Sequence, residues 1–577
     1  MYVKGVNMMA EYLAPGVYVE EFDSGVKAME GVGTSTAGFI GMAVRGPTRG
    51  KPRLVTNVTD FHKKFGGYLG EEYGEHRFLS YAVEQFFANG GSCCYIMRVA
   101  SDNQMSATVD IENVLRFTAT SSGNWGNAIK IQIRKTYQAK TFVTRKANED
   151  EEKKNQYVVK SSYGFYSGDV IEFNEKLYTV INVFDNILEL NKSLEGNYFK
   201  DETHPHAFLQ SVVMDIHVIY ENFEEVYENC SLNPSSPSFV VNALEKSDFI
   251  QVSLIETTDK KEDYEVFYTK YTTELQPYLL TGGTTIMPSV DYADMYIGKD
   301  KGPSQRSGIQ AFIEMNDVSI MAVPGITSEA IQSALITHCE MTGSRFAILD
   351  APFNATTIDQ LLWHRDQCNT TYAAIYHPWL LAFDPLLKKN SYTPPSGAMA
   401  GIYARVDNTR GVWKAPANEV VRNVIGLSVN YNEADQGKLN PKGVNLIRSL
   451  PGMGIRVWGA RTCSSDSNWK YVNVRRLFIY IEESIKANTS WAVFEPNDEN
   501  LWSRVSGTIH VFLTTLWRDG ALAGSSADEA FFVNVGRTTM TQDDISNGRL
   551  ICVIGVAPVR PAEFIIFRIT QKIQDAS

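Results

Sequence analysis

Residues 317–352 read DVSIMAVPGITSEAIQSALITHCEMTGSRFAILDAP, and this stretch decides the fold class. It contains two nearly continuous apolar runs, residues 317–325 and 345–352, which end in Pro and Gly residues. Such runs are typical of interior parallel strands that are covered on both faces. A helical pattern over residues 328–342 connects them, so the stretch predicts a βαβ unit. We therefore expect a mixed α/β protein.

The same alternation continues on both sides of this unit. Upstream, the apolar runs AGFIGMA (37–43) and SCCYIMRV (92–99) predict buried strands, with a helix over 78–88 between them. Downstream, apolar spacing predicts one helix around 474–485 and another around 502–516. Asn497 is expected to cap the second of these helices, and Gly520 and Gly524 to end it. Two further strands, within residues 549–558 and 563–571, are expected to close the chain.

The region between residues 140 and 206 has a different character. Its short apolar segments DVIEF, KLYTVINV and NILEL are separated by polar turns, which is typical of a small β-barrel or meander. The flanking runs at 127–133 and 212–220 are suited to pair with each other across it. We interpret residues 140–206 as an inserted, barrel-like outer domain.

Length and composition restrict the class of protein. A chain of 577 residues is too long for one core, so we expect two to four domains. The net charge of −12 and the lack of a basic run argue against direct nucleic-acid binding. The first residues do not resemble a signal peptide, and no apolar window approaches 18 residues, so no membrane insertion is expected. Seven cysteines, an odd number, indicate a protein that is made and folds in a reducing cytoplasm.

A search for chemistry yields no catalytic residue, no cofactor and no metal site. Phosphate-binding loops and nucleophile elbows are absent from the sequence. His364, Asp366 and Cys368 occupy every second position, but the surrounding pattern is helical, and a helix would turn Asp366 away from the other two. The adjacent pairs Glu482-Glu483 and Asp543-Asp544 are interpreted as solvated faces. We do not expect an enzyme.

The two chain ends carry the most informative apolar segments. A short strand pattern lies ahead of a Gly-rich stretch at the amino end, and an almost wholly apolar strand lies near the carboxyl end. Such edges pair either within their own subunit or with neighbouring copies by strand addition, and the residues alone leave both open. The positions concerned are Val17, Tyr18, Val19, Glu20 and Phe22, and Phe564, Ile565, Ile566, Phe567 and Ile569.

Several long segments resemble contractile tail sheath proteins, the family of bacteriophage tail sheaths and related injection particles. The similarity is strongest in PPSGAMAGIYARVDNTRGVWKAPAN (394–418) and in residues 439–478. Further matching segments run in family order, and they are LAPGVYVEEFDSG (13–25), LLTGGTT (279–285), RFAILDAP (345–352), FEPNDENLW (494–502) and VAPVRPAEFIIFRITQ (556–571). Residues 140–206 correspond to one of the family's variable insertions.

This resemblance implies a homopolymer of stacked hexameric rings that grows helically around an inner tube protein. Contraction of the metastable sheath would drive the tube through a target envelope, with baseplate and tail terminator proteins as further partners. The chain would be made in a host cytoplasm and act in a virion tail or extracellular particle. The terminal strands would cross to neighbouring subunits, and the helix that carries Trp502, Arg504 and Arg518 is a possible tube-facing element.

Within the signature, Arg405, Asp407, Arg410, Trp413 and Asn418 suggest either an anion site or structural ion pairs, and we favour ion pairs with Trp413 packed nearby. The expected domains are an arm (1–25), a middle α/β domain (26–139 and 207–390) and the insertion (140–206). A conserved domain (391–577) follows, and the resemblance implies an inner α/β part built from both chain ends. The alternative functions are another self-assembling virion protein and a cell-wall hydrolase.

Overall fold

The computed structural model describes residues 29–147, 155–196, 208–255, 260–564 and 566. The chain divides into two compact units, of which one comprises residues 33–475 and the other contains both chain ends, 1–32 and 476–577. The predicted boundary after residue 390 differs from this division. Residues 391–475 stay with the longer unit because they supply three strands to its main sheet and a helix that packs on that sheet.

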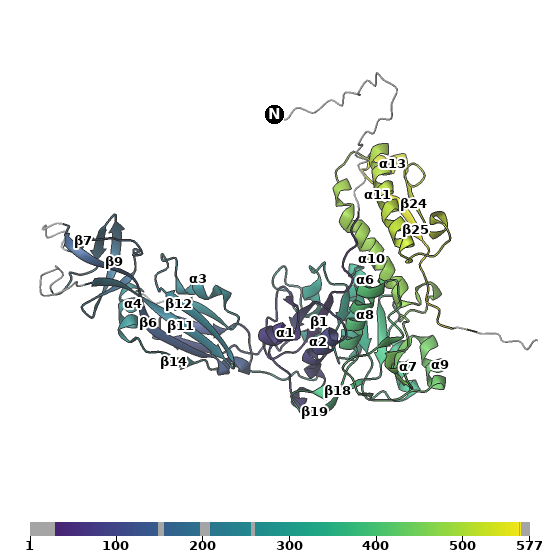
Figure 1. Cartoon of the computed structure of the whole chain (residues 1–577), viewed down its shortest axis with the longest axis horizontal. Coiled ribbons are helices and arrows are strands. Elements are labelled where there is room, and N and C mark those ends of the chain that lie inside the picture. Colours follow the sequence, from purple (N-terminus) through teal and green to yellow (C-terminus); the bar gives the residue numbers. More distant parts are fainter. Residues whose placement is uncertain (1–28, 148–154, 197–207, 256–259, 565, 567–577) are drawn as a thin grey trace, which may run out of the picture. The chain divides into compact units, whose positions relative to one another are not determined.

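The longer unit is organised around a nine-stranded sheet (Figure 1). Its six central strands are parallel, and the remaining three pair antiparallel at its edges. The order is β2 (Arg53–Val55), β3 (Cys94–Arg98), β1 (Ala37–Gly41), β15 (Ile320–Ala322), β16 (Phe346–Asp350), β17 (Ala373–His377), β22 (Val444–Leu450), β23 (Gly454–Val457) and β20 (Glu419–Val420).

The predicted βαβ unit is confirmed. Helix α6 (Glu329–Thr342) connects β15 to β16, and these strands are parallel, with Met321 opposite Ala347. The upstream unit is confirmed as well, since α2 (Leu79–Ala88) connects β1 and β3. The mixed α/β fold class predicted from the sequence therefore holds. The other helices of this unit are α1 (Val58–Phe65), α3 (Val240–Ala243), α4 (Lys260–Thr269), α5 (Ala293–Ile297), α7 (Ile358–Asp366), α8 (Ser396–Arg410) and α9 (Glu433–Leu439).

An eight-stranded sheet contains a closed ring. Strands β6 and β11 pair along most of their length, with Ile133 opposite Ile216, which confirms the predicted pairing of the two flanking runs. Strand β11 also pairs with β8, and the sheet runs on from β8 through β9, β10 and β7 back to β6. These six strands therefore close into a barrel around an apolar core. The sheet order is β12 (Phe223–Cys230), β11 (Phe208–Tyr220), β8 (Val170–Phe173), β9 (Lys176–Phe184), β10 (Ile187–Leu190), β7 (Gln156–Val159), β6 (Lys130–Lys146) and β14 (Gln276–Leu279).

Two three-stranded sheets complete the longer unit. The first packs its side chains into an apolar core shared with β6 and β11. The second presents Asp384 to the interior. Their orders are β13 (Ile250–Leu254), β5 (Leu115–Ala119) and β4 (Thr108–Ile111), and β19 (Lys389–Thr393), β18 (Leu380–Asp384) and β21 (Gly426–Leu427).

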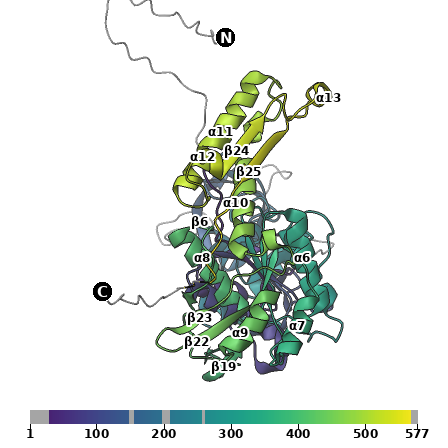
Figure 2. The ribbon, with the colours of Figure 1, turned by 90° about the vertical axis from the view of Figure 1, so that its right-hand side faces the viewer.

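In the unit that contains the chain ends, a long helix packs against a β-hairpin. Helix α11 (Glu499–Arg518) packs its apolar face against β24 (Phe531–Val535), which is antiparallel to β25 (Cys552–Val556) (Figure 2). Helix α10 (Val472–Asn488) leads into this unit, which also contains α12 (Ala527–Ala530) and α13 (Gln542–Ser546). The cap of α11 is Asp498, whose side chain accepts a hydrogen bond from the Leu501 nitrogen at 2.9 Å, and not the predicted Asn497. Asn497 instead accepts a hydrogen bond from the Trp502 indole at 2.8 Å.

Candidate functional site

The signature segment forms α8, a helix that is buried on almost every side. Residues 396–404 are all buried, and α8 contacts both the sheet and α2 (Figure 1). Gly397 and Gly401 let the two helices approach closely, because a Cβ on either residue would lie 2.4 Å from a backbone oxygen of α2. The Gly-x-x-x-Gly spacing of the signature is therefore explained by helix packing, and it is a signal that the sequence itself contains.

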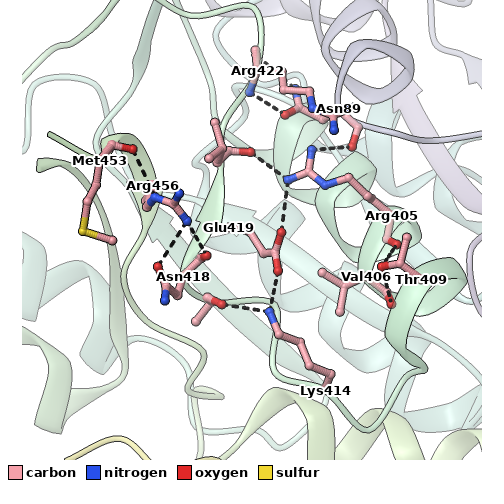
Figure 3. Close-up of polar contacts among 12 residues, drawn as sticks. Asn89, Arg405, Val406, Thr409, Lys414, Asn418, Glu419, Arg422, Met453 and Arg456 are labelled. Atoms are coloured by element: carbon pink, nitrogen blue, oxygen red, sulfur yellow. Dashed lines mark hydrogen bonds and ion pairs between the residues drawn. The ribbon is translucent and has the colours of Figure 1, made fainter.

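Arg405 anchors the exposed end of α8 to two other segments (Figure 3). Its guanidinium donates to the carbonyl oxygens of Asn89 at 3.0 Å and Val420 at 2.7 Å, and it forms an ion pair with Glu419 at 3.5 Å. Burial lowers the pKa of Arg405, and the neighbouring Arg422 adds to this effect, whereas Glu419 opposes it. These contacts are structural ion pairing within one subunit.

Asn89 is the hub of this network, although the sequence did not single it out. The residue is fully buried at the end of α2. Its side-chain oxygen accepts a hydrogen bond from the Arg422 nitrogen at 2.8 Å, and its amide nitrogen donates to the carbonyl oxygens of Gln85 and Arg422 (Figure 3). Because an unpaired buried amide is costly, these bonds fix the loop before β21 against α2.

Asn418 holds the next turn of the chain. Its φ of 57° lies in the left-handed region, which Asn tolerates better than most residues. Its nitrogen donates to the Val457 carbonyl oxygen at 2.8 Å, and its own carbonyl oxygen accepts from Arg456 at 2.8 Å (Figure 3). Lys414 forms an ion pair with Glu419, so this carboxylate is shared between Lys414 and Arg405.

The remaining signature residues do not converge on one point. Asp407 accepts a hydrogen bond from the Thr34 hydroxyl at 2.7 Å. The Trp413 ring covers Gly411, where a Cβ would lie 2.4 Å from the indole Cζ2 atom. Arg410 is exposed, and within the described ranges no hydrogen bond or ion pair connects its guanidinium to another side chain. Arg405 and Arg410 are thus not brought together as a common anion site would require.

The terminal strand residues fall into two groups. Val17, Tyr18, Val19, Glu20 and Phe22, and Ile565, Phe567 and Ile569, lie outside the described residues. Phe564 and Ile566 are described, and their exposed fractions are 72% and 80%. Neither belongs to a strand of its own chain, so the closing strand predicted over 563–571 is not formed at its described positions.

Helix α11 corrects part of the expectation for a tube-facing element. Trp502 is only 8% exposed and packs inside its own unit, so its side chain does not contribute to an outer face. The apolar spacing identified the buried face of the helix, and Trp502 lies on that face. Arg504 is half-exposed above the Trp491 ring, with 4.4 Å between its guanidinium carbon and the ring centroid, and Arg518 is exposed.

Helix α7 determines how His364, Asp366 and Cys368 are placed. His364 is buried, Asp366 is exposed at the end of the helix, and Cys368 lies beyond it, which confirms the predicted helix. In the described ranges, no group of three or more His, Cys, Asp or Glu side chains is arranged to hold a metal ion. Among the helices of these ranges, none is both long and apolar enough to cross a membrane.

Comparison with known proteins places the signature in context. A family model described as the phage tail sheath protein central domain matches residues 298–463, and the phage tail sheath C-terminal domain matches residues 464–572. The chain belongs to the tail sheath family. The tail sheath protein of Burkholderia phage BcepMu is 26% identical over 274 residues, which are 43% of this chain and 57% of that protein. That of Escherichia phage P2 is 24% identical over 290 residues, which are 48% of this chain and 70% of that protein.

A solved structure shares the fold of this tail sheath family member over nearly its full length. It is the PVC sheath complex of an extracellular contractile injection system in its contracted state. The TM-score is 0.52 at 23% identity, and the likeness covers 98% of this chain and 99% of the other. The central-domain match contains Arg405, Asn418 and Glu419 but not Asn89, whereas the C-terminal match contains α11, the β24–β25 hairpin and the exposed residues Phe564 and Ile566.

Proposed function

We propose that this chain is the structural subunit of a contractile sheath. Copies polymerise helically around an inner tube, and contraction drives the tube through a target cell envelope. The observation that carries the proposal is the β24–β25 hairpin, because neither outer edge of this two-stranded sheet has a strand partner among the described residues. Two open edges in one subunit give each copy two places where a neighbour's strand can add.

The energetics of the hairpin support strand addition. An isolated two-stranded sheet is only marginally stable in water, and α11 packs on one face of this hairpin. Strands from neighbouring copies would satisfy the outward backbone groups of both β24 and β25. The exposed apolar side chains of Phe564 and Ile566 would leave water in the same step. The arm at residues 17–22 and the strand at residues 564–569 are the segments we assign to these two edges.

Helical growth follows from the nature of the contact. A strand that leaves one subunit and joins the sheet of the next is a heterologous contact, and such contacts generate rings or helices according to the rotation between copies. We assign the chain to stacked hexameric rings around the tube, with baseplate and terminator proteins at the two ends. The particle is a phage tail or an extracellular injection particle assembled from protein made in a host cytoplasm.

The alternative functions differ in what they predict. Another self-assembling virion protein would also use open edges, but the matches to sheath domains over 298–463 and 464–572 support the sheath. A cell-wall hydrolase would require an acid or nucleophile with a substrate cleft and turnover by dilute monomer. Since the family is one of structural sheath proteins, we propose a subunit without catalytic activity.

Electron microscopy of the purified full-length chain tests the proposal. We expect hollow, six-fold helical cylinders wide enough to surround a tube. Deletion of residues 1–22 should leave a folded monomer that does not polymerise, because the arm joins subunits without filling their cores. Val19→Pro should act similarly by removing a ladder hydrogen bond, whereas Lys4→Pro, upstream of the arm strand, is the matched control.

The carboxyl end is tested in the same way, with Ile566→Pro against Asp575→Pro. Long filaments from the deleted or the Val19→Pro protein would contradict strand exchange by the arm. Monodisperse monomers from the unaltered chain at high concentration, with or without a tube protein, would contradict the sheath itself.

A further inference from the structure

One arginine holds two cysteines side by side in the longer unit. Cys368 follows α7, and Cys463 follows β23, almost a hundred residues later in the chain. The Arg365 guanidinium donates from one terminal nitrogen to the Cys368 carbonyl oxygen at 2.6 Å and from the other to the Cys463 carbonyl oxygen at 2.7 Å. Since a guanidinium is a rigid planar fork, both backbones are fixed at one short separation.

The thiols of this pair influence each other. The Cys368 sulfur donates a hydrogen bond to the Arg365 carbonyl oxygen at 3.5 Å, and each of the two thiols shifts the pKa of the other. The Cys463 nitrogen donates to the Ala373 carbonyl oxygen at 2.8 Å, which ties this residue to β17. These contacts hold the backbones of both cysteines in place.

The two thiols differ in exposure and in acidity. Cys463 is fully buried, whereas Cys368 is partly exposed. The hydrogen bond from Cys463 lowers the pKa of Cys368, and the positive charge of Arg365 adds to this effect. The same bond, together with burial, raises the pKa of Cys463. An accessible thiol of lowered pKa beside a buried thiol is the arrangement in which one sulfur attacks and the other resolves.

The other cysteines lack this arrangement. All seven are free thiols. Burial raises the pKa of Cys94, Cys230 and Cys339, which makes them poor nucleophiles. Cys552 is partly exposed, and burial raises its pKa too. Cys93 contacts Thr36, and its sulfur lies 3.6 Å from that hydroxyl oxygen.

We propose that Cys368 and Cys463 form an intrachain disulfide when the protein meets a low-molecular-weight disulfide. The Cys368 thiolate attacks one sulfur of that disulfide, its S–S bond breaks, and one small thiol leaves. Cys463 then loses its proton to solvent and attacks the Cys368 sulfur of the mixed disulfide, which releases the second small thiol. Two protein thiols are oxidised and one external disulfide is reduced to two thiols, so the exchange balances.

This disulfide would connect the segment before β17 to the segment after β23 in the main sheet. The closed segment contains α8 and the strands β17, β20, β22 and β23, so it encloses the signature helix and all four strands of the main sheet beyond β16. A reducing cytoplasm keeps the pair as thiols during folding, and an oxidising exterior supplies the external disulfide. The inference does not depend on polymerisation and goes beyond the proposed function.

Peptide mapping of the full-length protein tests the disulfide. The native protein is incubated with glutathione disulfide, quenched with N-ethylmaleimide under denaturing conditions and digested. We expect a Cys368–Cys463 linked peptide and an intact mass about 2 Da lower, with the five other cysteines alkylated. The oxidised protein should melt at least about 2 °C higher than the reduced protein, because the link constrains the unfolded chain.

Two variants make the test decisive. Cys463→Ala should stop the reaction at a glutathione adduct on Cys368, whereas Cys368→Ser should leave Cys463 unmodified in the native protein. Cys93→Ser is the matched control and should not alter the linkage. A glutathione adduct on Cys368 of the unaltered protein without the linked peptide would overturn the proposal, as would a disulfide between any other pair.

Discussion

The carboxylate of Asp350 accepts two hydrogen bonds from Ser396, one from its backbone nitrogen at 2.8 Å and one from its hydroxyl at 2.7 Å. Asp350 ends β16, and Ser396 begins α8. A third hydrogen bond reaches the same carboxylate from the Gly325 nitrogen at 2.9 Å, in the turn that follows β15. One fully buried side chain therefore joins two neighbouring strand ends to the start of the signature helix, where a negative charge also suits the helix dipole.

Asp350 should make stability depend on pH. Burial raises its pKa from the ordinary 3.8 to about 6, although the three hydrogen bonds favour the ionised form. Between pH 3.8 and about pH 6, the native state therefore binds more protons than the unfolded state. The contribution of this group is fully present below about pH 4 and is lost as pH rises through 6.

The free energy of unfolding of the unaltered protein, relative to that of Asp350→Asn, should therefore fall by up to roughly 3 kcal/mol between pH 4 and 7. Urea titrations at several pH values measure this difference. Asp366→Asn, at an exposed position, is the control and should run parallel to the unaltered protein. A parallel curve for Asp350→Asn would contradict the prediction.

Removal of the Arg77 charge should destabilise the protein strongly. Arg77 forms an ion pair with Asp384 at 2.9 Å, and the two side chains are only 5% and 1% exposed. Asp384 also accepts hydrogen bonds from Tyr81 and from the backbone at residues 386 and 387. Arg77→Met leaves this buried carboxylate without its cation, which typically costs about 3–5 kcal/mol.

Chemical unfolding followed by tryptophan fluorescence measures the loss. Arg116→Met is the matched control, because Arg116 forms a comparable pair with Asp110 on the surface. We expect no measurable change there. Equal effects of the two substitutions would show that burial does not determine the energy of these pairs.

Two arginines of the signature helix should behave differently. Arg405→Ala removes two hydrogen bonds to backbone carbonyl oxygens and one ion pair, so we expect a loss of about 2 kcal/mol in the free energy of unfolding. Arg405→Lys should be intermediate, because an ammonium cannot span the same acceptors. Arg410→Ala should fold as stably as the unaltered chain, because Arg410 is exposed.

Denaturation midpoints and sheath assembly are measured on the same preparations. If Arg410 lies at a contact between copies, Arg410→Ala should assemble less well while its midpoint stays unchanged. A lowered denaturation midpoint for Arg410→Ala, or an unchanged midpoint for Arg405→Ala, would contradict the prediction that Arg405 stabilises the fold and Arg410 does not.

The sequence predicted those elements whose signals are local. The strands and helices of 37–99 and 317–350 followed from apolar runs and helical spacing, and the pairing of β6 with β11 followed from two long apolar segments around the insertion. Partners that depend on tertiary contacts could not be predicted. Asn89 carries no local signal, because its partner Arg422 lies 333 residues later in the chain.

The predicted domain boundary after residue 390 differs from the division at residue 475 for a related reason. The two family matches run without a gap from residue 298 to 572, whereas the boundary between the compact units falls at residue 475. Continuity of sequence similarity reflects shared ancestry, and a structural boundary reflects where contacts end. These two properties need not change at the same residue.

The six-stranded ring formed by β6, β7, β8, β9, β10 and β11 differs from the hairpin in one topological respect. Each of these strands already has a neighbour on either side along the stretch that closes the ring, so that stretch offers no vacant backbone to another molecule. A strand from another molecule can therefore add to β24 or β25 without displacing a partner, but it cannot add in this way to the closed stretch of the ring. Changes in the length or sequence of the loops between the ring strands therefore leave the number of strand-addition sites at β24 and β25 unchanged.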